Sequence, residues 1–342
     1  MLLLLACTPP DADTGEPVDL VTLVTNPGPH HVGYQESSLT YGNAAAGEDR
    51  TLRLAAWYPT DDDSGPEASY FNGSIPAKGV IDGAEITKDT HPLAVFSHGH
   101  QGYAESTAFL MEHLATHGWV VLAPDHTGNT TLDGDNRTTA IYHQRPRDIT
   151  AVIDAAPDLG FSVTSDNVFA MGHSFGGYTM FALAGGRYDT SMCPSTASSF
   201  CSTWSDDQAA MFNAGFLDER IAAFVAMAPG DGTLFFDDGL TGLGPMLHMT
   251  ATEDQGPGSE ADLIWPQLAD GTNRRVILDG AGHLSFTMFA DQMEDVTMDR
   301  DEGFRIIDGY VLAWAWASQG DARGRALLDG EDAISEDASV QR

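Results

Sequence analysis

The pattern Gly-His-Ser-Phe-Gly at residues 172–176 has the spacing of a nucleophile held on a tight turn. It directly follows the apolar run at residues 168–171, where a strand is expected to meet a helix. In a Gly-x-Ser-x-Gly turn the serine hydroxyl is forced out above the sheet. A Cβ atom at Gly172 or Gly176 would collide with the neighbouring strand or helix backbone. Ser174 is therefore the candidate catalytic nucleophile.

A serine hydroxyl is a weak nucleophile at neutral pH, so it needs a histidine to take its proton and a carboxylate to orient that histidine. When the serine lies on such a turn, the acid and then the histidine follow it along the chain. His283 follows a predicted strand at residues 275–278 and lies in a Gly-Ala-Gly loop. That loop would let the imidazole lean over Ser174, so His283 is the candidate base.

Three carboxylates could orient this histidine. Asp254 lies just past a predicted strand at residues 245–250, at the carboxyl end where sites in open α/β sheets gather. Glu253 is adjacent but should point the other way in a turn, and Asp231 follows the preceding strand at residues 221–227. Asp254 is the preferred candidate, and the other two stay as alternatives.

Ester or amide chemistry at a serine also needs two backbone N–H groups that face the developing oxyanion. The first is expected from Phe175, the residue after the nucleophile. The second is expected from His100, with Gly99 as the alternative, in the glycine-rich loop after a predicted strand at residues 92–97. Histidines 98, 100 and 173 have no carboxylate or cysteine placed to complete a metal set, so a metal is not expected.

Strand-like and helix-like segments alternate from about residue 30, which is typical of a mostly parallel, doubly wound α/β sheet with helices on both faces. We expect one domain over residues 30–320. The polar stretch 185–218 is too long for an ordinary connection and is interpreted as a small cap insertion over the site, or else as an excursion away from it. The acidic tail 321–342 is expected to be loose. Strands are predicted at 51–58, 92–97, 119–124, 168–171, 221–227, 245–250 and 275–278 and helices at 105–117, 148–156, 261–268 and 304–317.

The 342-residue chain is strongly acidic, with 50 Asp and Glu against 16 Lys and Arg and a formal net charge of -34. Nucleic-acid phosphates would be repelled by this charge, so a nucleic-acid partner is not expected. A hydrophobic content of 42% supports an ordinary packed core. The acidity is typical of a solvated surface in a salty or extracellular medium.

The cysteines also favour a place outside the cytoplasm. Residues 1–7 form an apolar stretch too short to span a bilayer, and their end, Leu-Leu-Ala-Cys, resembles a bacterial lipobox that would make Cys7 a lipid anchor. A start-site accident without lipidation is the alternative. Residues 8–29 are expected to be a flexible tether, beginning with a polar, proline-rich run. Cys193 and Cys201 are expected to form one local disulfide, with two free thiols as the alternative.

Three segments together resemble an α/β-hydrolase: residues 96–100, 117–126 and 172–177. Within that superfamily the chain resembles the predicted dienelactone hydrolases, the platelet-activating-factor acetylhydrolases and the cutinase-like polyester hydrolases, over roughly residues 50 to 315. The resemblance implies a Ser-His-Asp esterase that acts on an ester substrate and uses no cofactor.

The chain departs from each of these relatives at a specific point. True dienelactone hydrolases use a cysteine where this chain has Ser174. The animal acetylhydrolases place the acid after the earlier strand, which would favour Asp231, whereas the cutinase-like relatives favour Asp254. The insertion at 185–218 is not typical of an open cutinase-like site.

These departures order the candidate substrates. Short-chain acyl esters come first, then a polyester or cutin-like polymer, then an acetyl-phospholipid. Peptidase or thioesterase action stays open because the same triad serves all acyl transfers. A non-catalytic surface binding protein on the same fold is the alternative of a different class.

Overall fold

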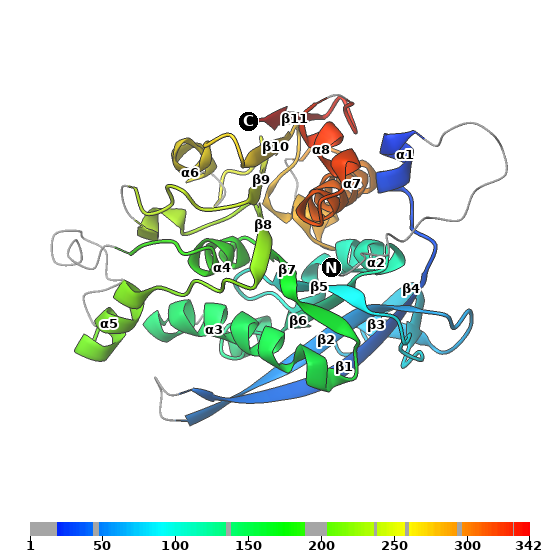
Figure 1. Cartoon of the computed structure of the whole chain (residues 1–342), viewed down its shortest axis with the longest axis horizontal. Helices are drawn as coiled ribbons and strands as arrows, with labels where there is room; N and C mark the ends of the chain where they lie inside the picture. The colour runs from blue at the N-terminus through cyan, green and yellow to red at the C-terminus, as the bar shows by residue number, and fades with distance from the viewer. Residues whose placement is uncertain are drawn as a thin grey trace, which may run out of the picture.

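The computed structural model describes residues 19–43, 48–134, 138–188, 204–235, 238–256, 260–292, 296–330 and 332–342. Strands form one sheet that passes through the middle of the molecule, with helices on either side (Figure 1). The strands are β1 (His31–Asn43), β2 (Glu48–Thr60), β3 (Glu67–Tyr70), β4 (Ile75–Asp82), β5 (His91–Ser97), β6 (Val120–Pro124), β7 (Val163–His173), β8 (Ile221–Met227), β9 (Met246–Ala251), β10 (Arg274–Leu278) and β11 (Ala338–Gln341). Their order in the sheet is β11-β10-β9-β8-β7-β5-β6-β2-β1-β4-β3.

The middle of the sheet is parallel, as the alternating pattern predicts. Strands β6, β5, β7, β8, β9 and β10 pair in parallel with their neighbours. The two ends of the sheet differ, because β2 pairs antiparallel with both β6 and β1, and β11 pairs antiparallel with β10. Strand β6 is buried along its whole length, which is typical of a parallel strand covered on both faces.

Helices cover both faces of the sheet and close a hydrophobic core on each. The helices are α1 (Leu20–Thr25), α2 (Ala108–Thr116), α3 (Thr139–Ala155), α4 (Phe175–Leu183), α5 (Asp206–Ala214), α6 (Ala261–Leu268), α7 (Arg300–Ser318) and α8 (Ala322–Leu328). One core includes buried side chains of α2, α7 and α8, such as Leu110 and Ile307. The other includes those of α3, α4 and α6, such as Ile149 and Met180.

Helix α3 begins well before the predicted start at residue 148. The sequence obscures this because Pro146 lies inside the helix, and a proline removes one backbone donor from the helical ladder. The carbonyl of Tyr142, four residues earlier, instead accepts a hydrogen bond from the hydroxyl of Tyr178 on α4 at 3.1 Å. This side-chain donor replaces the missing N–H and allows the helix to continue through the proline.

The expectation of a last strand at 275–278 followed by a loose tail is wrong. Residues 322–328 form α8, and residues 338–341 form β11, which extends the sheet beside β10. Leu327 and Leu328 are buried against the core formed with α7. These apolar contacts hold the tail in place despite its acidic composition. The expectation of a flexible tether is also wrong for residues 20–25, which form α1 with Val24 fully buried in the same core.

The predicted cap insertion is described only in part. Its last residues include α5, where Phe212 is fully buried, stacks on Trp204 and meets the ring of Tyr188 edge-on. Residues 189–203 lie outside the described residues, and so do Cys193, Cys201 and Cys7. Three expectations therefore stay predictions: that the insertion covers the site, that Cys193 and Cys201 form a disulfide, and that Cys7 carries a lipid anchor.

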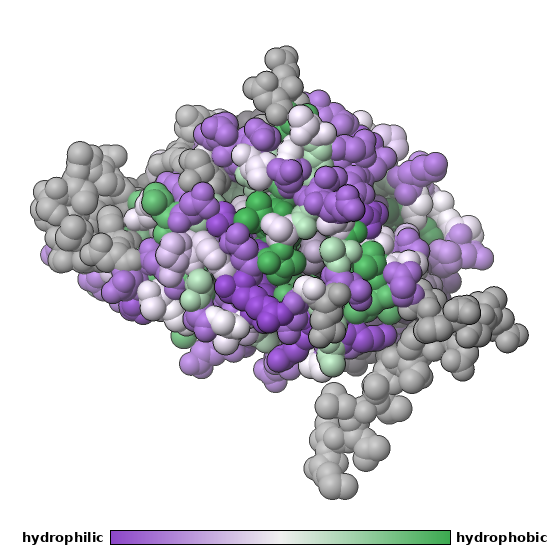
Figure 2. Space-filling view, turned by 90° about the horizontal axis from the view of Figure 1, so that it is seen from above, coloured by the Kyte–Doolittle hydropathy of each residue, from purple (hydrophilic) through white to green (hydrophobic). Residues whose placement is uncertain are grey.

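Hydrophilic side chains cover most of the face seen from above, around a smaller central group of hydrophobic ones (Figure 2). This appearance agrees with the strongly acidic composition of the chain. Within the described ranges, no helix is both long and apolar enough to cross a bilayer.

Candidate active site

Ser174 occupies the turn between the end of β7 and the start of α4. Its backbone is left-handed, with φ 54° and ψ -115°, a conformation that costs a non-glycine residue of order 1–3 kcal/mol. The N–H of Ser174 donates to the carbonyl of Met227 at 2.9 Å. The carbonyl of Ser174 accepts from the N–H groups of Gly177 at 2.8 Å and Gly230 at 3.1 Å. These bonds to β8, to the loop that follows it and to the first turn of α4 hold the strained turn in place.

The glycines on either side are needed for the reason expected from the sequence. A Cβ atom at Gly172 would overlap the carbonyl oxygen of Gly176, and one at Gly176 would overlap the carbonyl oxygen of Ser97. Both obstacles are backbone atoms, which cannot rotate out of the way as a side chain can. The turn therefore tolerates only glycine at these two positions.

The structure brings Ser174, His283 and Asp254 together. The Nε2 atom of His283 lies 2.9 Å from the Ser174 Oγ atom, and its Nδ1 atom lies 2.7 Å from an Asp254 carboxylate oxygen. Because an ionised carboxylate only accepts hydrogen bonds, Nδ1 carries the proton in the neutral ring and Nε2 faces the hydroxyl as an acceptor. The three residues follow β7, β10 and β9, at the carboxyl ends of parallel strands.

Asp254 remains ionised although it is 7% exposed. Burial alone would raise the pKa of its carboxyl group, but the hydrogen bond from His283, the charge of that ring and the N–H of Gly256 together lower the pKa below its ordinary value. The alternative carboxylates lie differently. Glu253 is exposed, and an oxygen of Asp231 lies 3.5 Å from the hydroxyl of Tyr142.

The expected oxyanion donors lie on two elements that meet at Ser174. Phe175 is the first residue of α4, at the positive end of the helix dipole. Gly99 lies directly against the nucleophile, since a Cβ atom at Gly99 would be 3.2 Å from the Cβ of Ser174. His100 follows in the same loop. The structure thus places both sequence-derived donors, and the alternative Gly99, on the segments that border the hydroxyl.

Comparison with known proteins gives matches to parts of the chain. Residues 69–198 match the chlorophyllase family. Cutinase est1 of Thermobifida alba is 33% identical over 106 residues, which are 30% of this chain and 33% of that protein. Cutinase 2 of Thermobifida cellulosilytica is also 33% identical over 106 residues, 30% of this chain and 37% of that protein. The chain therefore matches about a third of the length of these curated relatives.

A solved structure matches almost the whole chain. The ferulic acid esterase of Streptomyces cinnamoneus superposes with a TM-score of 0.63 at 20% sequence identity, over 86% of this chain and 92% of that one. The chain has the α/β-hydrolase fold. In an α/β-hydrolase the nucleophile, acid and histidine follow one another along the chain, which is the order of Ser174, Asp254 and His283.

The role of one residue in this α/β-hydrolase site was not predicted from the sequence. The sequence suggests His173 only as a metal ligand, but its Nε2 atom lies 2.9 Å from the backbone carbonyl oxygen of His283. Burial, and then the nearby charge of His283, lower the pKa of His173 to about 3. The ring is therefore neutral at ordinary pH and supports the candidate base. Its position next to the serine was the one signal available.

The other two histidines of the proposed oxyanion region have separate partners. His98 bonds to the carbonyl of Gly99 and to the N–H of His126, and His100 bonds to the side chain of Asn129. In the part of the chain that the structure describes, no three His, Cys, Asp or Glu side chains are grouped to hold a metal ion.

Proposed function

We propose that this protein is a serine carboxylic-ester hydrolase that works through an acyl-enzyme, with Ser174, His283 and Asp254 as its catalytic triad. The observation that carries the proposal is the continuous chain of hydrogen bonds from Asp254 through His283 to Ser174, at 2.7 and 2.9 Å. The partial matches to two cutinases, and the fold shared with a ferulic acid esterase, support the same chemistry.

In this mechanism the Ser174 Oγ atom attacks the ester carbonyl carbon while His283 Nε2 takes the hydroxyl proton. Asp254 keeps the ring oriented and stabilises the imidazolium that forms. The amides of Phe175 and His100 bind the negative oxygen of the tetrahedral intermediate. His283 then gives its proton to the leaving alcohol. Water, activated by the same histidine, finally cleaves the acyl-enzyme and releases the acid.

Short-chain acyl esters are the proposed substrates. The loops that carry His100 and His283 also carry Tyr103 and Phe289, and both of those rings contact Phe71. All three rings are half-buried, so part of their apolar surface is exposed at these loops. A polyester is the second candidate because the sequence matches are to cutinases.

The test is a series of p-nitrophenyl esters of increasing acyl length, with a polyester film assayed in parallel. The wild type should turn over the short esters best, and Ser174→Ala should lose both turnover and labelling by a fluorophosphonate probe. Release of soluble products from the film at a rate comparable to the ester rate would move the assignment to a polyester hydrolase. A folded wild type that hydrolyses none of the esters would instead support a binding protein on this fold.

An extracytoplasmic location, with a lipid anchor on Cys7, accompanies this proposal. The acidic composition and the lipobox-like residues 4–7 support it. In a bacterial host the wild type should incorporate labelled palmitate and sediment with membranes, whereas Cys7→Ala should do neither. Equal behaviour of the two proteins would refute the anchor.

A further inference from the structure

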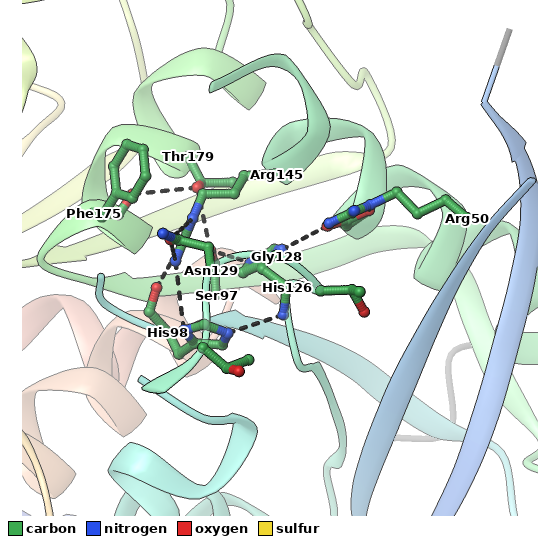
Figure 3. A network of polar contacts seen from close by, with 12 residues as sticks. Arg50, Ser97, His98, His126, Gly128, Asn129, Arg145, Phe175 and Thr179 are labelled. Atoms are coloured by element: carbon green, nitrogen blue, oxygen red, sulfur yellow. Dashed lines mark hydrogen bonds and ion pairs between the residues drawn. The ribbon is translucent and has the colours of Figure 1, made fainter. Parts of the chain in front are cut away.

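A fully buried arginine connects the two segments that carry the proposed oxyanion donors. Arg145 lies on α3 and reaches into the loop after β5 (Figure 3). Its Nη1 atom donates to the carbonyl of His98 at 2.6 Å, and its Nη2 atom donates to the carbonyl of Gly99 at 2.9 Å. The central carbon of the guanidinium also lies 4.4 Å from the ring centre of Phe175.

These two carbonyls determine where the next two amides point. In a planar trans peptide the C=O and N–H groups lie on opposite sides. Because Arg145 draws the carbonyls of His98 and Gly99 to its own side, the N–H groups of Gly99 and His100 face away from it. Gly99 lies directly against Ser174, so these amides border the nucleophile. Successive amides directed to one side are a known form of anion site.

The guanidinium is itself held in one orientation by Asn129. The side-chain oxygen of Asn129 accepts from Arg145 Nε at 3.1 Å and from Nη2 at 2.8 Å, and its amide nitrogen donates to His100 Nδ1 at 2.9 Å. A planar fork with several donors suits this task, whereas a lysine ammonium is a point charge that cannot form the same set of bonds.

A second row of buried groups supports the same loop from β2 and α3. His126 lies 2.9 Å from the hydroxyl of Ser97 through Nε2, and 2.8 Å from a carboxylate oxygen of Asp148 through Nδ1. Asp148 in turn accepts two hydrogen bonds from Arg50, at 2.6 and 2.8 Å. The loop is therefore built into a connected polar network rather than into apolar packing alone.

We propose that Arg145 is the positioning residue of the oxyanion hole, because it orients the amides of Gly99 and His100 and packs on Phe175. This proposal rests on the proposed esterase function. Arg145 acts through the loop and does not touch the substrate.

The test compares Arg145→Lys and Arg145→Met with the wild type on a short p-nitrophenyl ester. Loss of one oxyanion donor costs about 10²–10³-fold in kcat, so we expect kcat to fall by roughly 10- to 1000-fold while KM changes much less. Arg147→Met is the matched control on the same helix and should stay within about 2-fold of the wild type. A folded Arg145→Lys protein with wild-type kcat would overturn the proposal.

Hydrogen–deuterium exchange of residues 97–102 gives a second readout that does not depend on turnover. The amides of this segment should exchange faster in Arg145→Lys than in the wild type, with unchanged exchange in the β8 and β9 strands. Unchanged exchange at 97–102 would also overturn the proposal. If the wild type shows no Ser174-dependent turnover, the esterase assignment fails, and this exchange result alone then decides whether Arg145 positions the loop.

Discussion

The ring of His173 donates a hydrogen bond from Nε2 to the backbone carbonyl oxygen of His283, across 2.9 Å. A carbonyl oxygen can only accept, so Nε2 carries the proton. The residue beside the nucleophile therefore holds the backbone of the candidate base. Its pKa of about 3 keeps the ring neutral, so this support does not change over the pH range in which an esterase would work.

Replacing His173 with phenylalanine removes this donor and keeps a buried ring. A single hydrogen bond contributes about 0.5–1.5 kcal/mol, so we expect kcat on a short ester to fall by roughly 2- to 10-fold. His173→Gln, which keeps a side-chain N–H, should recover part of the loss. Steady-state kinetics of the three proteins check this, and a phenylalanine variant as active as the wild type would contradict it.

Asp254→Asn tests whether Asp254, rather than the adjacent Glu253, is the acid of the triad. The amide can donate to His283 Nδ1 and so favours the wrong tautomer, which in a serine triad lowers kcat by about 10⁴-fold. The matched control is Glu253→Gln, which neutralises the adjacent exposed carboxylate and should stay within about 2-fold of the wild type. Comparable losses in both variants would remove Asp254 from its proposed role.

The candidate site was largely predictable because the residues that it needs form short, local patterns in the sequence. The glycines around Ser174 are required by backbone contacts, and the strands that precede Asp254 and His283 are short apolar runs. The strands at 221–227 and helix at 261–268 have the predicted bounds for the same reason. Each of these signals lies within a few residues of the feature that it predicts.

The parts that were missed depend on contacts between distant residues. In the sequence Arg145 is simply a charged residue beside Pro146. Its hydrogen bond to Gly99 and its contact with the ring of Phe175 appear only in the folded chain. Strands β1, β3 and β4 were not predicted; β3 alternates exposed and buried residues, but only over four positions, which is too short to distinguish it from a turn or loop. The tail was missed because pairing with β10, rather than local composition, makes β11 a strand.

Gly176→Ala tests the tight packing of the nucleophile turn. The new methyl group would overlap the carbonyl oxygen of Ser97 on β5, so backbone must move. We expect a loss of about 3 kcal/mol or more in the free energy of unfolding, at the upper end for overpacked sites. Gly42→Ala is the control, since the nearest atom to its Cβ is 4.0 Å away. Urea unfolding of both variants measures the difference, and similar stabilities would show that the turn can adjust.

His248 is a buried histidine with no hydrogen-bond partner for either ring nitrogen among the described residues. It lies on β9 and stacks on Trp265 of α6, with ring centres 6.1 Å apart. Burial, and then the charge of Arg275, lower its pKa from 6.5 to about 3. The unfolded chain therefore binds a proton at this ring between pH 6.5 and 3 that the folded protein does not bind.

This difference gives a signed prediction for stability against pH. Stability is lost as pH falls below 6.5, by up to about 1.4 kcal/mol per pH unit for one proton. His248→Phe removes the titrating group but keeps the stack on Trp265. From pH 7 to pH 5 the variant should therefore gain about 2 kcal/mol relative to the wild type.

Urea unfolding of both proteins at pH 7 and pH 5 measures this gain. A difference in their stability at pH 7 does not affect it, because only the change between the two pH values is compared. His31→Gln removes an exposed histidine and should follow the wild-type dependence. Parallel curves for His248→Phe and the wild type would mean that His248 binds its proton equally well in the folded and unfolded states, since only a group with different proton affinity in the two states changes the slope.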